Sequence, residues 1–271
     1  MKTHAVLSAA SLSLALVATT PLAAQDRFDP VEARLLPGWV ASDGTRMTAI
    51  DIQLAPGWKT YWRAPGDGGI PPTFDWSGSR NIDGVDISWP APTVFDQNGM
   101  RSYGYEERLI LPLSITPSVR GEDMRVAVEV DMGVCSDVCV PYRLSLDQLL
   151  DTDQTRPTPS IASALAQQPY SSSEAGVTQA ICSIKPISDG LRIEASIAMP
   201  SAGGPEVMVI EPGLPEVWVS EAHTERQGNR VVATSDMIHV SGRVFSVDRS
   251  AIRITVLGQN HAVDILGCSG S

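Results

Sequence analysis

The chain has 271 residues, of which 43% are hydrophobic and 19% are charged, and its formal net charge is −11. An acidic surface of this kind repels nucleic acid and anionic lipid, so we expect neither as a partner. The sequence contains no GxSxG, no HExxH and no glycine-rich phosphate loop, which argues against serine hydrolases, zinc peptidases and P-loop nucleotide-binding proteins.

Residues 1–24 have the layout of a secretory signal peptide. Lys2 precedes an apolar run from about Ala5 to Ala18, and the small pair at 23–24 precedes a polar sequence. The run is shorter than the roughly 20 residues of a membrane-spanning helix, and no later stretch approaches that length, so we expect no direct membrane insertion. We predict export to the periplasm, an oxidising compartment in which disulfides persist.

The region from residue 25 to 150 alternates apolar and polar residues, as half-buried strands do. Ile50, Ile52 and Leu54 alternate with polar residues, and the same pattern recurs at 109–115 and 126–130. Glycine and proline separate the segments, and sustained helical periodicity is absent. We therefore predict one β-sandwich domain at residues 25–150.

Residues 151–176 break this pattern because proline, serine, threonine and glutamine dominate them. Such a composition predicts a linker. Within it, Ser160 is a candidate cap for a short helix that runs through Gln168 and is ended by Pro169.

Strand alternation resumes at residue 177. It is clearest at 191–197 and 252–256, while QGN at 227–229 and GQN at 258–260 predict hairpin turns. No alternation of strands and helices appears. We predict an all-β chain in which a second antiparallel β-sandwich, at residues 177–271, follows the linker and its short helix.

Four cysteines permit three pairings, and their positions favour Cys135 with Cys139 and Cys182 with Cys268. The second bridge would join the first and last strands of its domain. It closes a loop of about 87 residues, worth roughly 4.6 kcal/mol, so we predict that it is structural.

The first bridge closes a loop of only about five residues and contributes roughly 2 kcal/mol. It requires a sharp local turn, for which Gly133 and Pro141 supply the breaks. Bridges in such short loops tend toward higher reduction potential, as labile disulfides do. Spacing alone leaves a redox role and a structural role equally open.

Metal binding is a further alternative for this pair. Met132, Cys135 and Cys139 are soft ligands suited to Cu(I), whereas a structural zinc site would need two more ligands. The histidines of the mature chain all lie in the second domain and none has metal-ligand spacing; they are His223, His239 and His261. We therefore predict no resident metal or cofactor and keep copper handling as an alternative.

Four motifs occur in order between about residues 30 and 150: PGWKTYWRAPGDGG at 56–69, SWPAP at 88–92, YGY at 103–105 and CSDVCVP at 135–141. Their tryptophans have core packing as the simplest role. The order of the motifs resembles the periplasmic N-terminal domain of the thiol:disulfide interchange protein DsbD. It is closest to the version in the suppressor-of-copper-sensitivity ScsB proteins, which points to copper tolerance.

The resemblance implies an immunoglobulin-like fold and a redox-active cysteine pair. Cys139 would form mixed disulfides with partners and Cys135 would resolve them. Electrons would come from a membrane-embedded thiol reductant and pass to oxidised thioredoxin-like periplasmic proteins. A cap over the cysteines would consist of Ser102, Tyr103, Gly104 and Tyr105. Ser102 stands where some members carry phenylalanine, so shielding would fall to Tyr103 or Tyr105.

Full-length relatives continue into membrane and thioredoxin-like domains, so we expect this chain, as a stand-alone soluble protein, to borrow both from separate proteins. We predict a periplasmic protein-disulfide reductase. The alternatives are a non-catalytic client-binding sandwich and a Cu(I)-handling protein. Asp131 and Asp137 flank the sulfurs, with no basic residue between Met132 and Tyr142, which predicts a thiol pKa near or above about 8.5.

Overall fold

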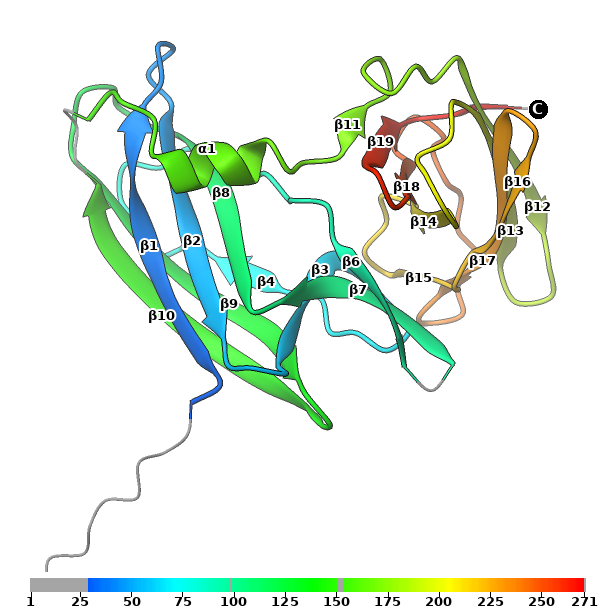
Figure 1. Cartoon of the computed structure of the whole chain (residues 1–271), viewed down its shortest axis with the longest axis horizontal. Coiled ribbons are helices and arrows are strands. Elements are labelled where there is room, and N and C mark those ends of the chain that lie inside the picture. Colours follow the sequence, from blue (N-terminus) through cyan, green and yellow to red (C-terminus); the bar gives the residue numbers. More distant parts are fainter. Residues whose placement is uncertain (1–28, 98, 151–153, 271) are drawn as a thin grey trace, which may run out of the picture.

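The computed structural model describes residues 29–97, 99–150 and 154–270, and it contains two β-sandwich domains side by side (Figure 1). The predicted signal peptide, residues 1–24, lies outside the described residues. In the described part of the chain, no helix is long and apolar enough to cross a membrane.

The first domain consists of two packed sheets. One has the order β1 (Val31–Val40), β2 (Arg46–Leu54), β8 (Arg108–Thr116) and β5 (Gly84–Ile87). The other has the order β10 (Cys139–Leu150), β9 (Met124–Cys135), β3 (Lys59–Gly66), β7 (Met100–Glu106) and β6 (Thr93–Gln97), with β4 (Thr73–Asp75) also paired to β9.

Alternation along these strands builds the core of the first domain, as the period of two predicts. Ile50, Leu111 and Val128 are buried together with Trp62. Trp58 and Trp89 of the motifs, together with Trp76, pack against this core. The core extends to Val209 and other apolar residues of the second domain, so the two domains pack against each other.

The second domain repeats the two-sheet plan. One sheet has the order β11 (Tyr170–Ser171), β19 (Ala262–Leu266), β18 (Arg253–Leu257) and β14 (Val207–Glu211). The other has the order β15 (Val217–Val219), β17 (Arg230–His239), β13 (Leu191–Ala198), β12 (Gln179–Pro186) and β20 (Ser269–Gly270), with β16 (His223–Gln227) also paired to β17.

Strand pairing is antiparallel apart from two short parallel contacts, β11 with β19 and β12 with β20. Turns lie at both predicted hairpins, between β16 and β17 and between β18 and β19. The prediction of two immunoglobulin-like antiparallel β-sandwiches is confirmed.

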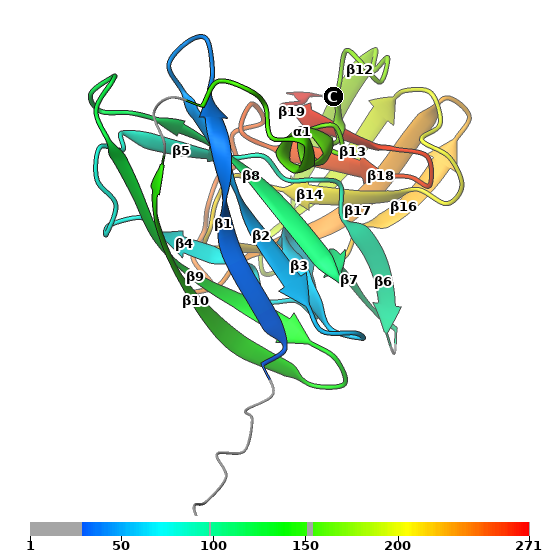
Figure 2. The ribbon, with the colours of Figure 1, turned by 60° about the vertical axis from the view of Figure 1, so that its left-hand side comes forward.

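The helix α1 spans Pro159–Leu165 and lies beside β8, between the two domains (Figure 2). Its cap is Thr158, not the predicted Ser160, and it ends before Gln168. Proline is favoured in the first turn because its missing N–H would have no partner there, and the helix begins at Pro159, two residues earlier than a cap at Ser160 predicts. Ile161 packs on the outer face of the first sheet, so this part of the linker is docked.

Candidate functional site

The two cysteines of the first domain meet at the end of one hairpin. β9 ends at Cys135, β10 begins at Cys139, and the register places them directly opposite each other. Their Cα atoms are 4.1 Å apart and a disulfide bond joins their sulfurs. Between them, the Ser136 N–H donates to the Val138 carbonyl, which closes the turn. The local turn predicted for this pair is present.

The two cysteines differ in accessibility. Cys135 is 1% exposed, whereas Cys139 is exposed, as are its near neighbours Val138 and Val140. Thiol–disulfide exchange requires an attacking sulfur to reach the sulfur of its partner. Cys139 is therefore the one that a folded partner can meet first.

Tyr61 on β3 reaches both sulfurs. Its hydroxyl oxygen lies 2.8 Å from Sγ of Cys135 and 3.1 Å from Sγ of Cys139, and it also donates to the Gly68 carbonyl at 3.3 Å. Burial raises the pKa of Tyr61, so the phenol keeps its proton at neutral pH. Bridged sulfurs carry no hydrogen, so the single hydroxyl proton of Tyr61 is the only hydrogen available in these contacts, and the two sulfurs share it with the Gly68 carbonyl.

Two glycines make room for the Tyr61 ring. A Cβ at Gly133 would lie 2.9 Å from Cδ2 of Tyr61, and a Cβ at Gly69 would lie 2.8 Å from its Cδ1. Carbon atoms pack at about 3.5–4.0 Å, so a side chain at either position would displace the ring. Glycine at these positions lets a large aromatic side chain stand against the disulfide.

Lys59 lies on the same face of this sheet, because β3 pairs it with Cys135. It is buried, and its Nζ lies 4.8 Å from the Phe95 ring centroid and 5.9 Å from that of Tyr61. Burial lowers the pKa of Lys59, while Glu106 opposes that change. The Lys59 Nζ donates to Oγ of Ser102 at 3.5 Å. Positive charge on the face that carries Cys135 favours a thiolate, which is opposite in direction to the high thiol pKa that the hairpin sequence predicts.

The acidic residues of the hairpin affect the cysteine thiols less than their sequence positions indicate. Asp131 is exposed and receives a hydrogen bond from Arg143, with Nε and Oδ1 2.6 Å apart. Asp137 is exposed at the turn. Exposed and paired carboxylates influence a neighbouring group weakly, so the predicted effect of these charges on the thiols is reduced.

The family described as "Thiol:disulfide interchange protein DsbD, N-terminal" matches residues 32–151. The first domain is a DsbD N-terminal domain. The crystal structure of the N-terminal periplasmic domain of ScsB from Proteus mirabilis is similar over 89% of this chain and 93% of that chain, with a TM-score of 0.66 and 23% identity. That likeness concerns the fold, and it extends over both sandwiches. No curated protein matches the chain.

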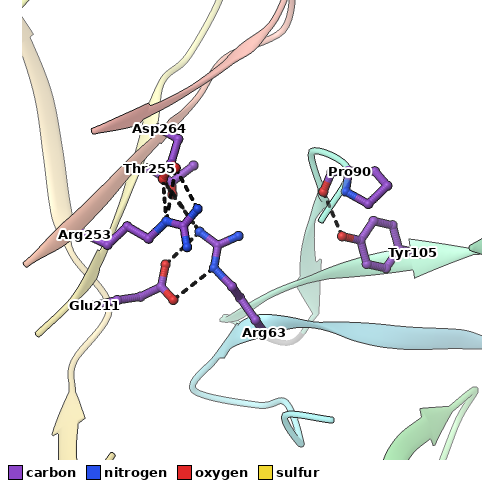
Figure 3. Close-up of polar contacts among 7 residues, drawn as sticks. All are labelled: Arg63, Pro90, Tyr105, Glu211, Arg253, Thr255 and Asp264. Carbon is purple, nitrogen blue, oxygen red and sulfur yellow. Dashed lines mark hydrogen bonds and ion pairs between the residues drawn. The ribbon is translucent and has the colours of Figure 1, made fainter. Parts of the chain in front are cut away.

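The proposed cap of this DsbD N-terminal domain lies in a strand rather than in a loop. Ser102, Tyr103, Gly104 and Tyr105 belong to β7 and are all buried. The Tyr103 ring packs edge-on against a core tryptophan, and Tyr105 donates its hydroxyl to a proline carbonyl at 2.8 Å (Figure 3). Both tyrosines face the core, so Tyr61 is the aromatic residue at the sulfurs.

The copper ligand set is not brought together in the DsbD N-terminal domain. Met132 is buried in the core, and it lies three positions before Cys135 on the same strand. Residues an odd number apart in a strand point to opposite faces. The thioether and the sulfurs are therefore on opposite sides of the sheet. Among the described residues, no group of three or more histidine, cysteine or acidic side chains could hold a metal.

The second cysteine pair lies in the other domain, away from the DsbD N-terminal motifs. A disulfide joins Cys182 and Cys268, whose Cα atoms are 5.7 Å apart. Cys182 is fully buried in the core of the second sandwich, and Cys268 immediately precedes β20, which pairs with β12. The bridge ties β12 to the residue that leads into the last strand, β20, and its structural role stays a prediction.

Sequence reasoning missed Tyr61 and Lys59 as residues of the DsbD N-terminal site. Both stand in the quoted motif at 56–69, and they are two positions apart, so strand alternation puts them on one face. The pairing of β3 with β9 then places these two residues beside Cys135. No local sequence pattern predicts this pairing.

Proposed function

We propose that this protein is a periplasmic thiol–disulfide exchange protein, a protein-disulfide reductase that works through Cys135 and Cys139. One observation carries the proposal. A buried and an exposed cysteine are bridged at a hairpin end, with a protonated phenol against both sulfurs. The DsbD N-terminal family, whose name is that of an interchange protein, supports the same chemistry.

The reaction begins from the dithiol form. The Cys139 thiolate attacks one sulfur of a partner disulfide, so that a Cys139–partner bond forms and the partner's own bond breaks, releasing a partner thiolate. The Cys135 thiolate then attacks Cys139, which forms the intramolecular bridge and releases the second partner thiol. The dithiol loses two electrons and the partner disulfide gains them.

Tyr61 would assist the first step through its hydroxyl proton. Its raised pKa keeps it a donor at neutral pH, so it can hydrogen bond to a thiolate as it does to the bridged sulfurs. Lys59 adds positive charge beyond the ring. Both effects stabilise a thiolate, lower the pKa of the thiol and raise the fraction that is reactive at neutral pH.

The redox cycle requires a donor and an acceptor outside this chain. We propose a membrane-embedded thiol reductant as the donor and oxidised thioredoxin-like periplasmic proteins as the acceptors. The exposed Cys139, with Val138 and Val140 beside it, offers a small apolar surface to either. The residues Ser102–Tyr105 would act in docking only if β7 rearranged, since they are buried in this conformation.

A redox titration in glutathione buffers tests the proposal. Alkylation and mass spectrometry report each cysteine pair separately in the same sample. We expect Cys135–Cys139 to equilibrate within the glutathione range while Cys182–Cys268 stays oxidised. A Cys135–Cys139 bridge that resists reduction to below about −300 mV would refute the relay and favour the client-binding alternative.

Partner capture provides the second test. The Cys135→Ala variant leaves Cys139 free to form mixed disulfides that cannot be resolved. In living cells it should accumulate adducts through Cys139, whereas Cys139→Ala, which leaves only the buried sulfur, should accumulate few. Equal trapping by the two variants would contradict the assigned roles.

A further inference from the structure

A groove of about 570 Å³ lies between the two domains. One wall is the segment of residues 63–71 that follows Tyr61, and the other contains β14 and β15 of the second domain. Most of its lining is apolar, and Trp218 on β15 is 46% exposed there. A large exposed tryptophan in a concave apolar site is typical of an interaction surface.

The groove is bordered by the end strands of two sheets. Among the described strands, β14 ends one sheet of the second domain and β15 ends the other, so each lies at an edge. Sheet edges bind extended peptides, because their backbone groups can pair with an added strand while pockets take alternate side chains. These borders therefore suit an extended segment.

The groove is continuous with the cysteine site through the segment 66–71. Gly69 and Pro71 line the groove, while Ile70 between them lies against Gly133 of the hairpin. The Gly68 carbonyl accepts a hydrogen bond from the Tyr61 hydroxyl, which also contacts both sulfurs. Residues 66–71 thus contribute to one wall of the groove and also contact Tyr61 and Gly133 beside the disulfide.

Ion pairs hold the two walls in place. Arg63 forms two hydrogen bonds with Glu211 of β14, at 3.1 and 3.0 Å, and also donates to Thr255 (Figure 3). On the other side, Arg101 of β7 pairs with Glu221 at 2.8 Å. Two-pronged arginine–carboxylate contacts fix geometry well, so the groove exists before a partner arrives.

We infer that the second domain is a docking module. The groove between β14, β15 and residues 63–71 binds an extended apolar segment of the partner protein, and the disulfide of that partner reacts at Cys139. This inference rests on the proposed function. It assigns to the second sandwich the task of holding the partner while sulfur exchange occurs on the first.

Two synthetic peptides of equal length test the inference. Each carries one cysteine activated as a thionitrobenzoate mixed disulfide. One has a tail of alternating valine and leucine, and the other a tail of serine and glycine. The reduced protein attacks the peptide sulfur, forms a protein–peptide disulfide and releases coloured thionitrobenzoate. We expect the apolar peptide to react about ten-fold faster than the polar one, as a tryptophan-centred contact would provide.

The Trp218→Ala variant should lose this advantage and leave the rate of the polar peptide unchanged. Leu266→Ala is the matched control, because Leu266 is an exposed apolar residue of the second domain outside the groove. Equal rates of the two peptides with wild type would overturn the inference while leaving the proposed function intact. If neither peptide reacted with the reduced protein, the proposed function would be overturned.

Binding without chemistry provides a readout that does not depend on the cysteines. A fluorescent apolar peptide with serine in place of cysteine should bind wild type and Leu266→Ala, and bind Trp218→Ala at least about ten-fold more weakly. Unchanged binding by Trp218→Ala would overturn the inference. Sedimentation that shows a wild-type dimer converted to a monomer by Trp218→Ala would also overturn it, because a second copy would then be the occupant.

Discussion

Replacing Tyr61 with phenylalanine isolates the contribution of one hydroxyl to the reactivity of the cysteines. The ring between Gly69 and Gly133 is kept, while the hydroxyl at 2.8 Å from Cys135 and 3.1 Å from Cys139 is lost. A hydrogen bond to a charged acceptor is worth about 1.5–3 kcal/mol, and one pKa unit corresponds to about 1.4 kcal/mol. Tyr61→Phe should therefore raise the pKa of the reactive thiol by about 1–2 units.

The assay is alkylation of the reduced protein by iodoacetamide between about pH 5 and 10, since only the thiolate reacts. The phenol itself does not titrate in the lower part of this range, because burial raises the pKa of Tyr61 above its ordinary value. Tyr142→Phe is the matched control. Tyr142 lies on the same hairpin, but its hydroxyl donates to Asp29 instead of to the sulfurs.

Identical alkylation midpoints for wild type and Tyr61→Phe would refute the role assigned to the hydroxyl. A shift of the same size in Tyr142→Phe would show that hairpin perturbation, not the hydrogen bond, is the cause. Unfolding in urea should separate these outcomes from a loss of fold, since a neutral hydrogen bond to the Gly68 carbonyl contributes only about 1 kcal/mol.

Three further changes test the framework around the site. Gly133→Ala should destabilise the oxidised protein in urea by about 1–3 kcal/mol, because the added carbon would lie 2.9 Å from Tyr61; unchanged stability would contradict that contact. Replacing Cys182 and Cys268 with alanine should lower the free energy of unfolding of the second domain by about 2–5 kcal/mol, while the rate of thiol–disulfide exchange at Cys135 and Cys139 should stay unchanged. A changed exchange rate would show that the two cysteine pairs are coupled. Burial would raise the pKa of Asp51, but hydrogen bonds from two arginines outweigh burial and lower the pKa. The contribution of Asp51 to the free energy of unfolding is therefore full above about pH 4 and is lost as pH falls through the lowered pKa. Asp51→Asn should therefore be destabilised at pH 7 and approach wild type in acid, and a pH-independent difference would argue against this linkage.

Local sequence pattern was sufficient for much of the fold. Alternation along single strands predicted two sandwiches, since a strand with one buried face must repeat every second residue. Alternation also predicts that Met132 and Cys135, which are an odd number of positions apart, lie on opposite faces of β9. The same rule puts Tyr103 and Tyr105 on one face, which is the core face.

What surrounds the sulfurs was decided by the tertiary structure. Lys59 lies opposite Cys135, and Tyr61 contacts it, because β3 pairs with β9 across more than 70 residues of chain. The partner of a strand is set by the packing of the whole sandwich. The groove beside Trp218 depends on two domains meeting, through Arg63 and Glu211, which are separated by 148 positions. Alternation is a property of each strand alone, whereas these contacts exist only after the strands and domains have been brought together.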